Sequence, residues 1–325
     1  MVERKAFLLG CAVAAVGLFA SGAEAADKVT FVTDFGFNGR HAFLFVATEK
    51  GYYKDENLEV TLVRGQGSND ALKQIAAGSA HMGLADATTL TVARANDKLP
   101  VKLVASIYAN VPQALYFMAD SNIKTPKDLE GKTIADTPAG SLKIMFPIYA
   151  RLAGIDATKV NWISMPADAE GPSLFTGKVD AAAQYTIGEP LMVKLAAPRK
   201  VAKLTFADVG IEGYNTSIVA PDATISGNPD LVRRITRATL KGLAAAIANP
   251  KEAGAIMHKY HREVDEDIGE GETKIVGDLA RRPGVPLGFL EKDRVEKTVQ
   301  LVKDTLPLKG PISPEEVYAP GFVSN

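Results

Sequence analysis

Residues 29–60 read VTFVTDFGFNGRHAFLFVATEKGYYKDENLEV. The opening β-forming residues predict a strand, and the glycines and asparagine of 34–39 predict a loop that ends it. From His41 apolar side chains recur at helical spacing until Gly51, which is placed to end a helix, and a second strand follows from Leu58. The stretch is therefore half of a βαβ unit. In an open parallel sheet, ligands bind at the loop that follows such a strand.

The same arrangement recurs further along the chain. Residues 71–84 predict a helix, a glycine turn and a short strand, and residues 173–182 repeat that order. Another strand ends at Asp136 and leads into a helix that begins near Ser141. One supersecondary pattern used twice predicts two similar α/β lobes.

The chain length also suits two lobes, since 325 residues exceed one ordinary domain. We assign residues 26–113 and 216–325 to lobe one and residues 114–215 to lobe two. The two segments near 114–119 and 210–216 are expected to cross between the lobes and to form the hinge.

Residues 1–25 predict an export signal. Arg4 and Lys5 precede an apolar core, and a small-x-small cleavage site ends at Ala25. The apolar core is shorter than the roughly 20 residues that a membrane-spanning helix needs. We therefore expect cleavage after Ala25 and a periplasmic protein. The only cysteine, Cys11, lies in this segment, so we expect no disulfide, thiolate metal site or cysteine nucleophile in the mature protein.

The charge balance argues against nucleic acid as a partner. The formal net charge is −1, 46% of residues are hydrophobic, and no basic patch or RNA-binding motif is present. The glycines of residues 64–70 fit neither the dinucleotide nor the Walker spacing, so they do not predict a phosphate loop.

Four segments together resemble one known family. They are the run ATEKGYYKDENLEV, the turn at Gly78, the segment 129–132 and the turn at 177–180. The chain resembles the periplasmic solute-binding proteins of the thiamine-pyrimidine, alkanesulfonate, taurine and nitrate group, over nearly the whole mature chain. His81 departs from the family, which usually carries an acidic residue there.

The resemblance implies a type II periplasmic binding protein. Each lobe would be a mostly parallel sheet flanked by helices, and two crossover segments would join the lobes. It also implies a monomer that serves the permease and ATPase of an ABC importer, without cofactor or metal.

Candidate ligand-binding residues lie in the loops at strand ends, at helix starts and at the predicted crossovers. They are Asp34, Phe35, Phe37, Asn38, His41, Ser68, Asn69, Asp86, Thr88, Tyr108, Thr137, Gly140, Ser141, Tyr185, Glu189, Tyr214 and Asn215.

Several of these residues have an equally simple structural interpretation. Ser68 or Asn69 is placed to cap a helix, as is Asp86. Tyr108 and Tyr185 offer stacking faces or core packing, and His41 contacts the ligand or ties down its loop. The resemblance puts a glutamate at Glu189 in the pyrimidine-binding branch, where its carboxylate would accept hydrogen bonds from ring N–H and amino groups; a surface carboxylate is the alternative.

The mixture of carboxylates and aromatic rings favours a flat, nitrogen-bearing ligand with amino groups, such as an aminopyrimidine, a thiamine precursor or a flavin-like compound. A sulfonate or nitrate site would prefer N–H donors and a cation without carboxylates, and Arg40 and Arg64 are the cations in these loops. The anion-binding function therefore stays the first alternative.

The second alternative is that the chain is an enzyme, because eukaryotic members of the family that it resembles make the thiamine pyrimidine. Those relatives carry a cysteine-rich motif where this chain has residues 211–216, and a reactive histidine where it has residues 86–89. Both features are missing, so the sequence predicts a binding protein without catalytic residues.

Overall fold

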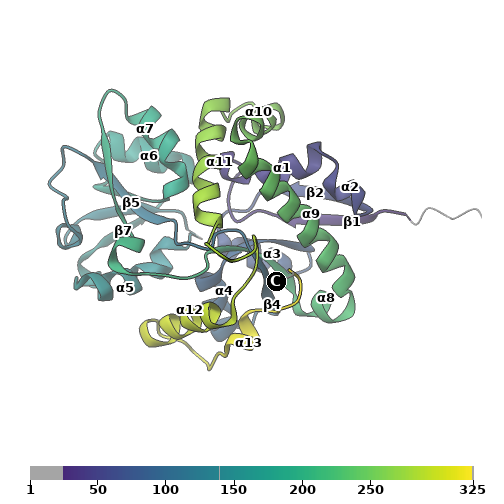
Figure 1. Cartoon of the computed structure of the whole chain (residues 1–325). Coiled ribbons are helices and arrows are strands. Elements are labelled where there is room, and N and C mark those ends of the chain that lie inside the picture. Colours follow the sequence, from purple (N-terminus) through teal and green to yellow (C-terminus); the bar gives the residue numbers. More distant parts are fainter. Residues whose placement is uncertain (1–24, 139, 324–325) are drawn as a thin grey trace, which may run out of the picture.

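The computed structural model describes residues 25–138 and 140–323. The predicted signal peptide therefore lies outside the described residues, apart from Ala25. Figure 1 shows two α/β halves, with the second sheet and α5, α6 and α7 on the left and the first sheet on the right. We call these halves the first and the second lobe, after their sheets. The predicted two-lobed α/β architecture is confirmed.

The first lobe contains a five-stranded sheet in the order β2-β1-β3-β10-β4. Its strands are β1 (Asp27–Val32), β2 (Leu58–Val63), β3 (Met82–Asp86), β4 (Val101–Ser106) and β10 (Thr216–Pro221). β1 pairs in parallel with β2 and β3, whereas β10 runs antiparallel between β3 and β4.

The second lobe repeats this plan in the order β7-β6-β8-β5-β9. Its strands are β5 (Gln113–Met118), β6 (Thr133–Asp136), β7 (Asn161–Ser164), β8 (Ala181–Tyr185) and β9 (Val201–Thr205). β6 pairs in parallel with β7 and β8, and β5 is antiparallel to β8 and β9.

The antiparallel strand of each sheet is the strand that enters from the other lobe. The chain leaves β4 for β5 through residues 107–112 and returns from β9 to β10 through residues 206–215. The two connections contact each other, since the backbone N–H of Asn215 donates to the carbonyl of Tyr108 at 3.0 Å. The first predicted crossover, 114–119, was wrong by several residues because that segment forms most of β5. The exact domain boundaries stay a prediction.

Helices cover both sheets. Those of the first lobe are α1 (Ala42–Glu49), α2 (Tyr52–Asp55), α3 (Ser68–Ala76), α4 (Ala87–Asp97), α8 (Asp222–Gly227), α9 (Pro229–Ala248), α10 (Pro250–Tyr260), α11 (Glu266–Ala280), α12 (Lys292–Thr305) and α13 (Pro314–Val317). Those of the second are α5 (Leu142–Ala153), α6 (Ala167–Phe175) and α7 (Glu189–Ala196). None of the described helices is long and apolar enough to cross a membrane.

Helix α11 stands between the lobes in Figure 1, and glycines let it come close to its neighbours. A Cβ at Gly39 would lie 2.7 Å from the Cα of Gly269, and one at Gly254 would lie 2.5 Å from the carbonyl oxygen of Glu266. Only glycine fits such close backbone approaches. This packing brings Glu272 of α11 to the space between the lobes.

Residues 29–60, quoted at the start of the sequence analysis, form the strands and the helix that their pattern predicts. β1 ends at Val32, α1 ends at Glu49, and Gly51 adopts the left-handed conformation expected of a helix-ending glycine, with φ 74°. The predicted cap of the next helix is wrong in detail. α3 already begins at Ser68, its N-cap is Gly67, and no side chain caps it.

Candidate functional site

A pocket lies between the two lobes and contains about 540 Å³ of empty space, including its open mouth. Its walls are the loop after β1, the start of α3 and α11 on the first lobe, and the ends of β6 and β8 with α6 on the second. The lining residues are Asp34, Phe35, Asn38, Arg40, Gly67, Ser68, Asp136, Thr137, Gly140, Ser141, Leu142, Glu170, Ala183, Gln184, Tyr185, Ile187, Gly188 and Glu272.

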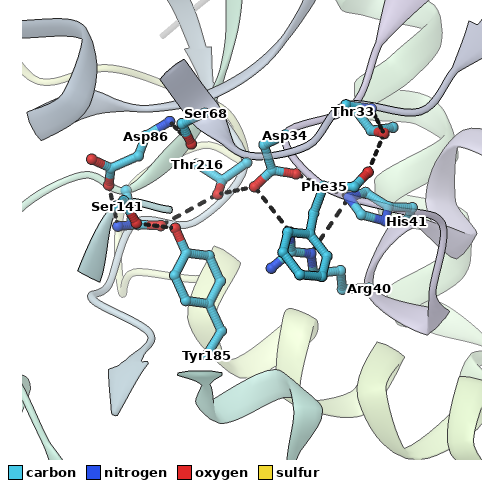
Figure 2. Close-up of polar contacts among 12 residues, drawn as sticks. Thr33, Asp34, Phe35, Arg40, His41, Ser68, Asp86, Ser141, Tyr185 and Thr216 are labelled. Atoms are coloured by element: carbon cyan, nitrogen blue, oxygen red, sulfur yellow. Dashed lines mark hydrogen bonds and ion pairs between the residues drawn. The ribbon is translucent and has the colours of Figure 1, made fainter. Parts of the chain in front are cut away.

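Asp34 is the most thoroughly bonded acid of the pocket. It is 3% exposed, lies 2.9 Å from Nε2 of His41, accepts a hydrogen bond from Oγ1 of Thr216 at 3.2 Å, and forms an ion pair with Arg40 at 3.3 Å (Figure 2). Burial alone would raise the pKa of this carboxyl. The Arg40 charge and the His41 hydrogen bond outweigh burial and lower the pKa to about 2. Asp34 is therefore ionised at neutral pH.

Arg40 connects the two walls of the pocket. Its guanidinium carbon lies 4.9 Å from the ring centroid of Phe35 on the first lobe and 4.9 Å from that of Tyr185 on the second. Both distances are within the range of cation–π attraction. Among the described residues Arg40 is the only arginine that lines the pocket, and it is already paired with Asp34 and with two aromatic rings.

A second layer of polar side chains supports the first-lobe wall. Asp86 caps α4 by accepting from the backbone N–H of Thr89 at 2.7 Å, and its other oxygen accepts from the Asn215 amide. The Asp86 backbone N–H donates to Oγ of Ser68 at 3.0 Å. These bonds place Ser68 at the pocket, whereas Asp86 and Asn215 act behind it.

On the second lobe, Asp136 is the last residue of β6, and Asp34 lies just after the end of β1 on the first lobe. Its two oxygens accept hydrogen bonds from the backbone N–H groups of Thr137 and Lys143 at 2.8 and 2.9 Å. Burial raises its pKa to about 6 despite these bonds. Because Asp136 accepts from the Lys143 N–H at the start of α5 and from the Thr137 N–H before it, these two N–H groups are not free for an anion.

Hydroxyl groups complete the second-lobe wall. Oγ of Ser141 and Oη of Tyr185 share a hydrogen bond of 2.9 Å, and both side chains are buried. This bond orients the Tyr185 ring toward Arg40, as Figure 2 shows.

Two further acids reach the pocket from helices. Burial raises the pKa of Glu170 on α6 to about 9 and that of Glu272 on α11 to about 7. Glu272 accepts a hydrogen bond from the backbone N–H of Arg40 at 3.1 Å. At neutral pH the pocket holds two mainly ionised acids, a partly ionised Glu272, a neutral Glu170 and one arginine, so its balance is negative.

The structure brings eight of the seventeen predicted residues to the pocket. They are Asp34, Phe35, Asn38, Ser68, Thr137, Gly140, Ser141 and Tyr185. Three more support these residues from behind, namely His41, Asp86 and Asn215.

The other six do not line the pocket. They are Phe37, Asn69, Thr88, Tyr108, Glu189 and Tyr214. Phe37 packs instead on Phe45 and His261, with ring centroids 5.2 and 4.6 Å away, and the Oη of Tyr214 donates to Glu291 near α12.

Helix geometry and core packing account for the remaining four. Asn69 and Thr88 are the second residues of α3 and α4, and neither lines the pocket. Tyr108 is buried in the connection after β4. Glu189 opens α7 and forms an ion pair with Lys203 of β9, with its side chain 39% exposed. This arrangement favours the alternative interpretation of Glu189, a surface carboxylate, and the ligand contact stays a prediction.

The sequence interpretation missed Asp136, Gln184, Glu170 and Glu272. Asp136 and Gln184 lie at the ends of β6 and β8, so the strand-end pattern that predicted Asp34 could have predicted them. Glu170 and Glu272 lie inside helices, where no local pattern marks the residue that faces a pocket.

The family model described as NMT1/THI5 like matches residues 38–253. The chain belongs to the NMT1/THI5-like family. The riboflavin-binding protein RibY of Chloroflexus aurantiacus is 32% identical over 313 residues, which cover 91% of this chain and 86% of that one. The formylaminopyrimidine-binding protein of Halalkalibacterium halodurans is 24% identical over 305 residues, which cover 92% of each chain.

Other relatives of this chain are enzymes by name. The 4-amino-5-hydroxymethyl-2-methylpyrimidine phosphate synthase of Aspergillus parasiticus is 25% identical over 240 residues, covering 70% of this chain and 69% of that one. Among solved structures, the periplasmic aliphatic sulphonate binding protein SsuA of Escherichia coli superimposes with a TM-score of 0.69 at 13% identity, over 92% of this chain and 94% of that one. This likeness shows the periplasmic binding protein fold.

Proposed function

We propose that this chain is the periplasmic substrate-binding protein of an ABC importer and that it holds a small heteroaromatic nitrogen compound between its lobes. An aminopyrimidine, a thiamine precursor or a flavin-like compound is the ligand class. The permease and ATPase of the importer are its partners, and the protein acts as a monomer.

The chemistry of the pocket walls carries this proposal. Phe35 and Tyr185 offer ring faces from opposite lobes, which suits a flat ligand. Asp34 and Asp136 offer carboxylate oxygens, which accept hydrogen bonds from amino and ring N–H groups. The names of the riboflavin-binding and formylaminopyrimidine-binding relatives point to the same class of compound.

The same walls argue against a sulfonate or nitrate. An anion needs a cation or free N–H donors, and the ionised acids of the pocket repel it. Arg40 is the only lining cation among the described residues, and it is already paired with Asp34. The resemblance to SsuA extends to the fold and does not supply this chemistry.

Binding rather than synthesis is the proposed activity, although some relatives are named as synthases. The only cysteine of the chain is Cys11, in the predicted signal peptide, so the cysteine-rich motif of the synthases has no counterpart here. Incubation of the protein with precursors of the pyrimidine, followed by mass spectrometry, is expected to yield no new pyrimidine. Formation of one would overturn this part of the proposal.

Calorimetry with a panel of compounds tests the ligand class. The panel contains formylaminopyrimidine, 4-amino-5-hydroxymethyl-2-methylpyrimidine, riboflavin, an aliphatic sulfonate and nitrate. We expect at least one ring compound to bind with a stoichiometry of one per chain and neither anion to bind. Saturable binding of the sulfonate or nitrate, with none of the ring compounds, would replace the proposal by the anion-binding function.

Closure of the lobes on the ligand is part of the proposal. The lobes contact each other outside the pocket, where Nζ of Lys194 on α7 lies 2.8 Å from Asp265, next to α11. We expect small-angle scattering to show a smaller radius of gyration when ligand is added. An unchanged radius together with saturable binding would indicate a rigid site.

A further inference from the structure

Glu170 is a buried acid without a cation. It lies on α6, lines the pocket and is 1% exposed. Among the described residues no ion pair involves it. Its Oε2 accepts a hydrogen bond from the Gln184 amide, and its Oε1 is buried without any partner.

Burial and the lack of a neighbouring cation among the described residues determine the protonation state of Glu170. An ionised carboxylate is strongly disfavoured where water is excluded and no positive charge is near. Burial, and then the negative charge of Asp136, raise the pKa of Glu170 to about 9. The carboxyl is therefore neutral at pH 7. Because Oε2 already accepts from Gln184, the proton belongs on Oε1, which becomes an unpartnered O–H donor.

We propose that Glu170 acts as a neutral acid that determines specificity, its Oε1–H donating to a ring nitrogen of the ligand and its Oε2 accepting from the adjacent amino group. This inference rests on the proposed function and names the ring edge that the site selects. The second lone pair of Oε2 is available for the ligand, because the Gln184 amide uses only one. The matching ligand edge is a ring nitrogen acceptor beside an amino donor, as in a 4-aminopyrimidine.

The arrangement also explains why a buried donor is left without a partner. An unpartnered buried polar group is unfavourable, and such groups are uncommon in folded proteins. In the pocket the ligand would supply the missing acceptor. A charged partner is not needed, so the contact suits an uncharged ring.

Two variants of Glu170 test whether the side chain contacts the ligand as a neutral acid or as an ionised carboxylate. Glutamine can present an N–H donor beside a carbonyl acceptor, as the neutral acid presents its O–H beside Oε2, although its NH2 group carries a second N–H, whereas methionine offers neither donor nor acceptor. With 4-amino-5-hydroxymethyl-2-methylpyrimidine as the probe, we expect calorimetry to give Glu170→Gln an affinity within about threefold of the unmodified protein. Glu170→Met should bind about 10- to 100-fold more weakly. Asp168→Asn is the matched control, because it changes an exposed carboxylate of the same helix that does not line the pocket, and its affinity should be unchanged.

A ligand analogue provides a second measurement that needs no variant of Glu170. Replacing the 4-amino group by a dimethylamino group removes the N–H donor. The unmodified protein should bind this analogue about tenfold or more weakly, and Glu170→Met should discriminate between the two compounds less than the unmodified protein does.

Infrared spectroscopy tests the protonation state without ligand. At pH 7 the difference spectrum between the unmodified protein and Glu170→Gln should contain the C=O stretch of a protonated carboxyl. Absence of that band would overturn the inference even if Glu170→Met does not fold.

The outcomes distinguish this inference from the proposed function. If the unmodified protein binds no ring compound of the panel, the proposed function fails. If it binds one but Glu170→Met keeps its affinity within about twofold, only the inference fails. If Glu170→Gln loses as much affinity as Glu170→Met, the contact requires an ionised carboxylate, and the neutral acid is wrong.

Discussion

Asp34 and Glu170, two acids on opposite walls of the pocket, have opposite pKa shifts. On the first lobe, Asp34 lies among Arg40, His41 and Thr216, and its pKa falls to about 2. On the second lobe, Glu170 has one amide partner and no cation, and its pKa rises to about 9. Both side chains are buried. Burial alone therefore does not decide whether an acid of this pocket is charged; the neighbouring charges do.

Because of this difference, we expect Asp34 and Glu170 to have different roles in the pocket. Around Asp34 the first lobe carries a network of charges and hydrogen bonds, although Oδ1 of the lining residue Asn38 is also buried without a partner. The second lobe carries a neutral acid with an unpartnered oxygen, which is the feature that a ligand can complete. The variants below test this comparison, from the largest expected effect to the smallest.

Replacing Asp34 should have the largest effect. Asp34→Asn keeps the shape of the side chain but leaves the buried Arg40 without its opposite charge. Removing one partner of a buried ion pair typically lowers the free energy of unfolding by about 3–5 kcal/mol. Urea unfolding at neutral pH measures this change. The matched control is Asp265→Asn, which removes an exposed partner of Lys194 and should leave the unfolding midpoint unchanged.

The comparison between Asp34 and Glu170 would be wrong if Asp34→Asn and Glu170→Gln changed the free energy of unfolding equally. Glu170→Gln removes an acid that is already neutral in the folded protein. We expect this variant to be as stable as the unmodified protein at pH 7, or more stable. An equal loss of stability in both variants would show that the two walls do not differ.

The effect of Glu170 on the pH dependence of stability should be smaller than the loss of stability expected for Asp34→Asn. Between its ordinary pKa of 4.5 and its raised pKa of about 9, Glu170 binds more protons in the folded than in the unfolded protein. Stability from this group is therefore present at low pH and is lost as pH rises through that window, by at most about 1.4 kcal/mol per pH unit. Asp34 has the opposite sign, and its contribution is lost only as pH falls from 3.8 toward about 2.

Unfolding at about pH 6 and about pH 8 isolates the Glu170 contribution. The unmodified protein should lose more stability over this interval than Glu170→Gln does, because Asp136 and Glu272 titrate equally in both proteins. Parallel pH profiles would show that Glu170 is not held neutral by the fold.

Tyr185 links the two walls, and its two contacts are separable. Tyr185→Phe keeps the ring near Arg40 but removes the hydrogen bond to Ser141, which should lower the free energy of unfolding by about 1 kcal/mol. Tyr185→Leu also removes the ring and should lose about 0.5–2 kcal/mol more. Thermal and urea unfolding of both variants measure these losses. Equal stability of the two variants would show that the cation–π contact between the lobes contributes nothing.

The smallest effect is expected at Glu189, which pairs with Lys203 and does not line the pocket. Glu189→Gln should leave the affinity for the ring compounds within about twofold. A loss of about tenfold or more would place its carboxylate in contact with the ligand after all and would reopen the interpretation made from the sequence.

The sequence by itself determined the architecture, because the patterns that predict strands, loops and helices are local. Residues 29–60 predicted β1, α1, the turn at Gly51 and β2, and the repeated pattern predicted two lobes. The strand-end rule also predicted Asp34 and Phe35 in the first lobe, because the connection after a parallel strand must open at that edge of the sheet.

Only the tertiary structure decided which side chains on helices face the pocket. Glu189 and Glu170 both lie on helices beside the second sheet, but α7 turns Glu189 toward Lys203, and α6 turns Glu170 inward. Glu272 reaches the site because glycines let α11 approach η1 (Gly39–His41) closely. The protonation states also depend on neighbours far apart in the chain. A sequence pattern specifies which face of a helix is polar, and packing against distant elements decides what that face meets.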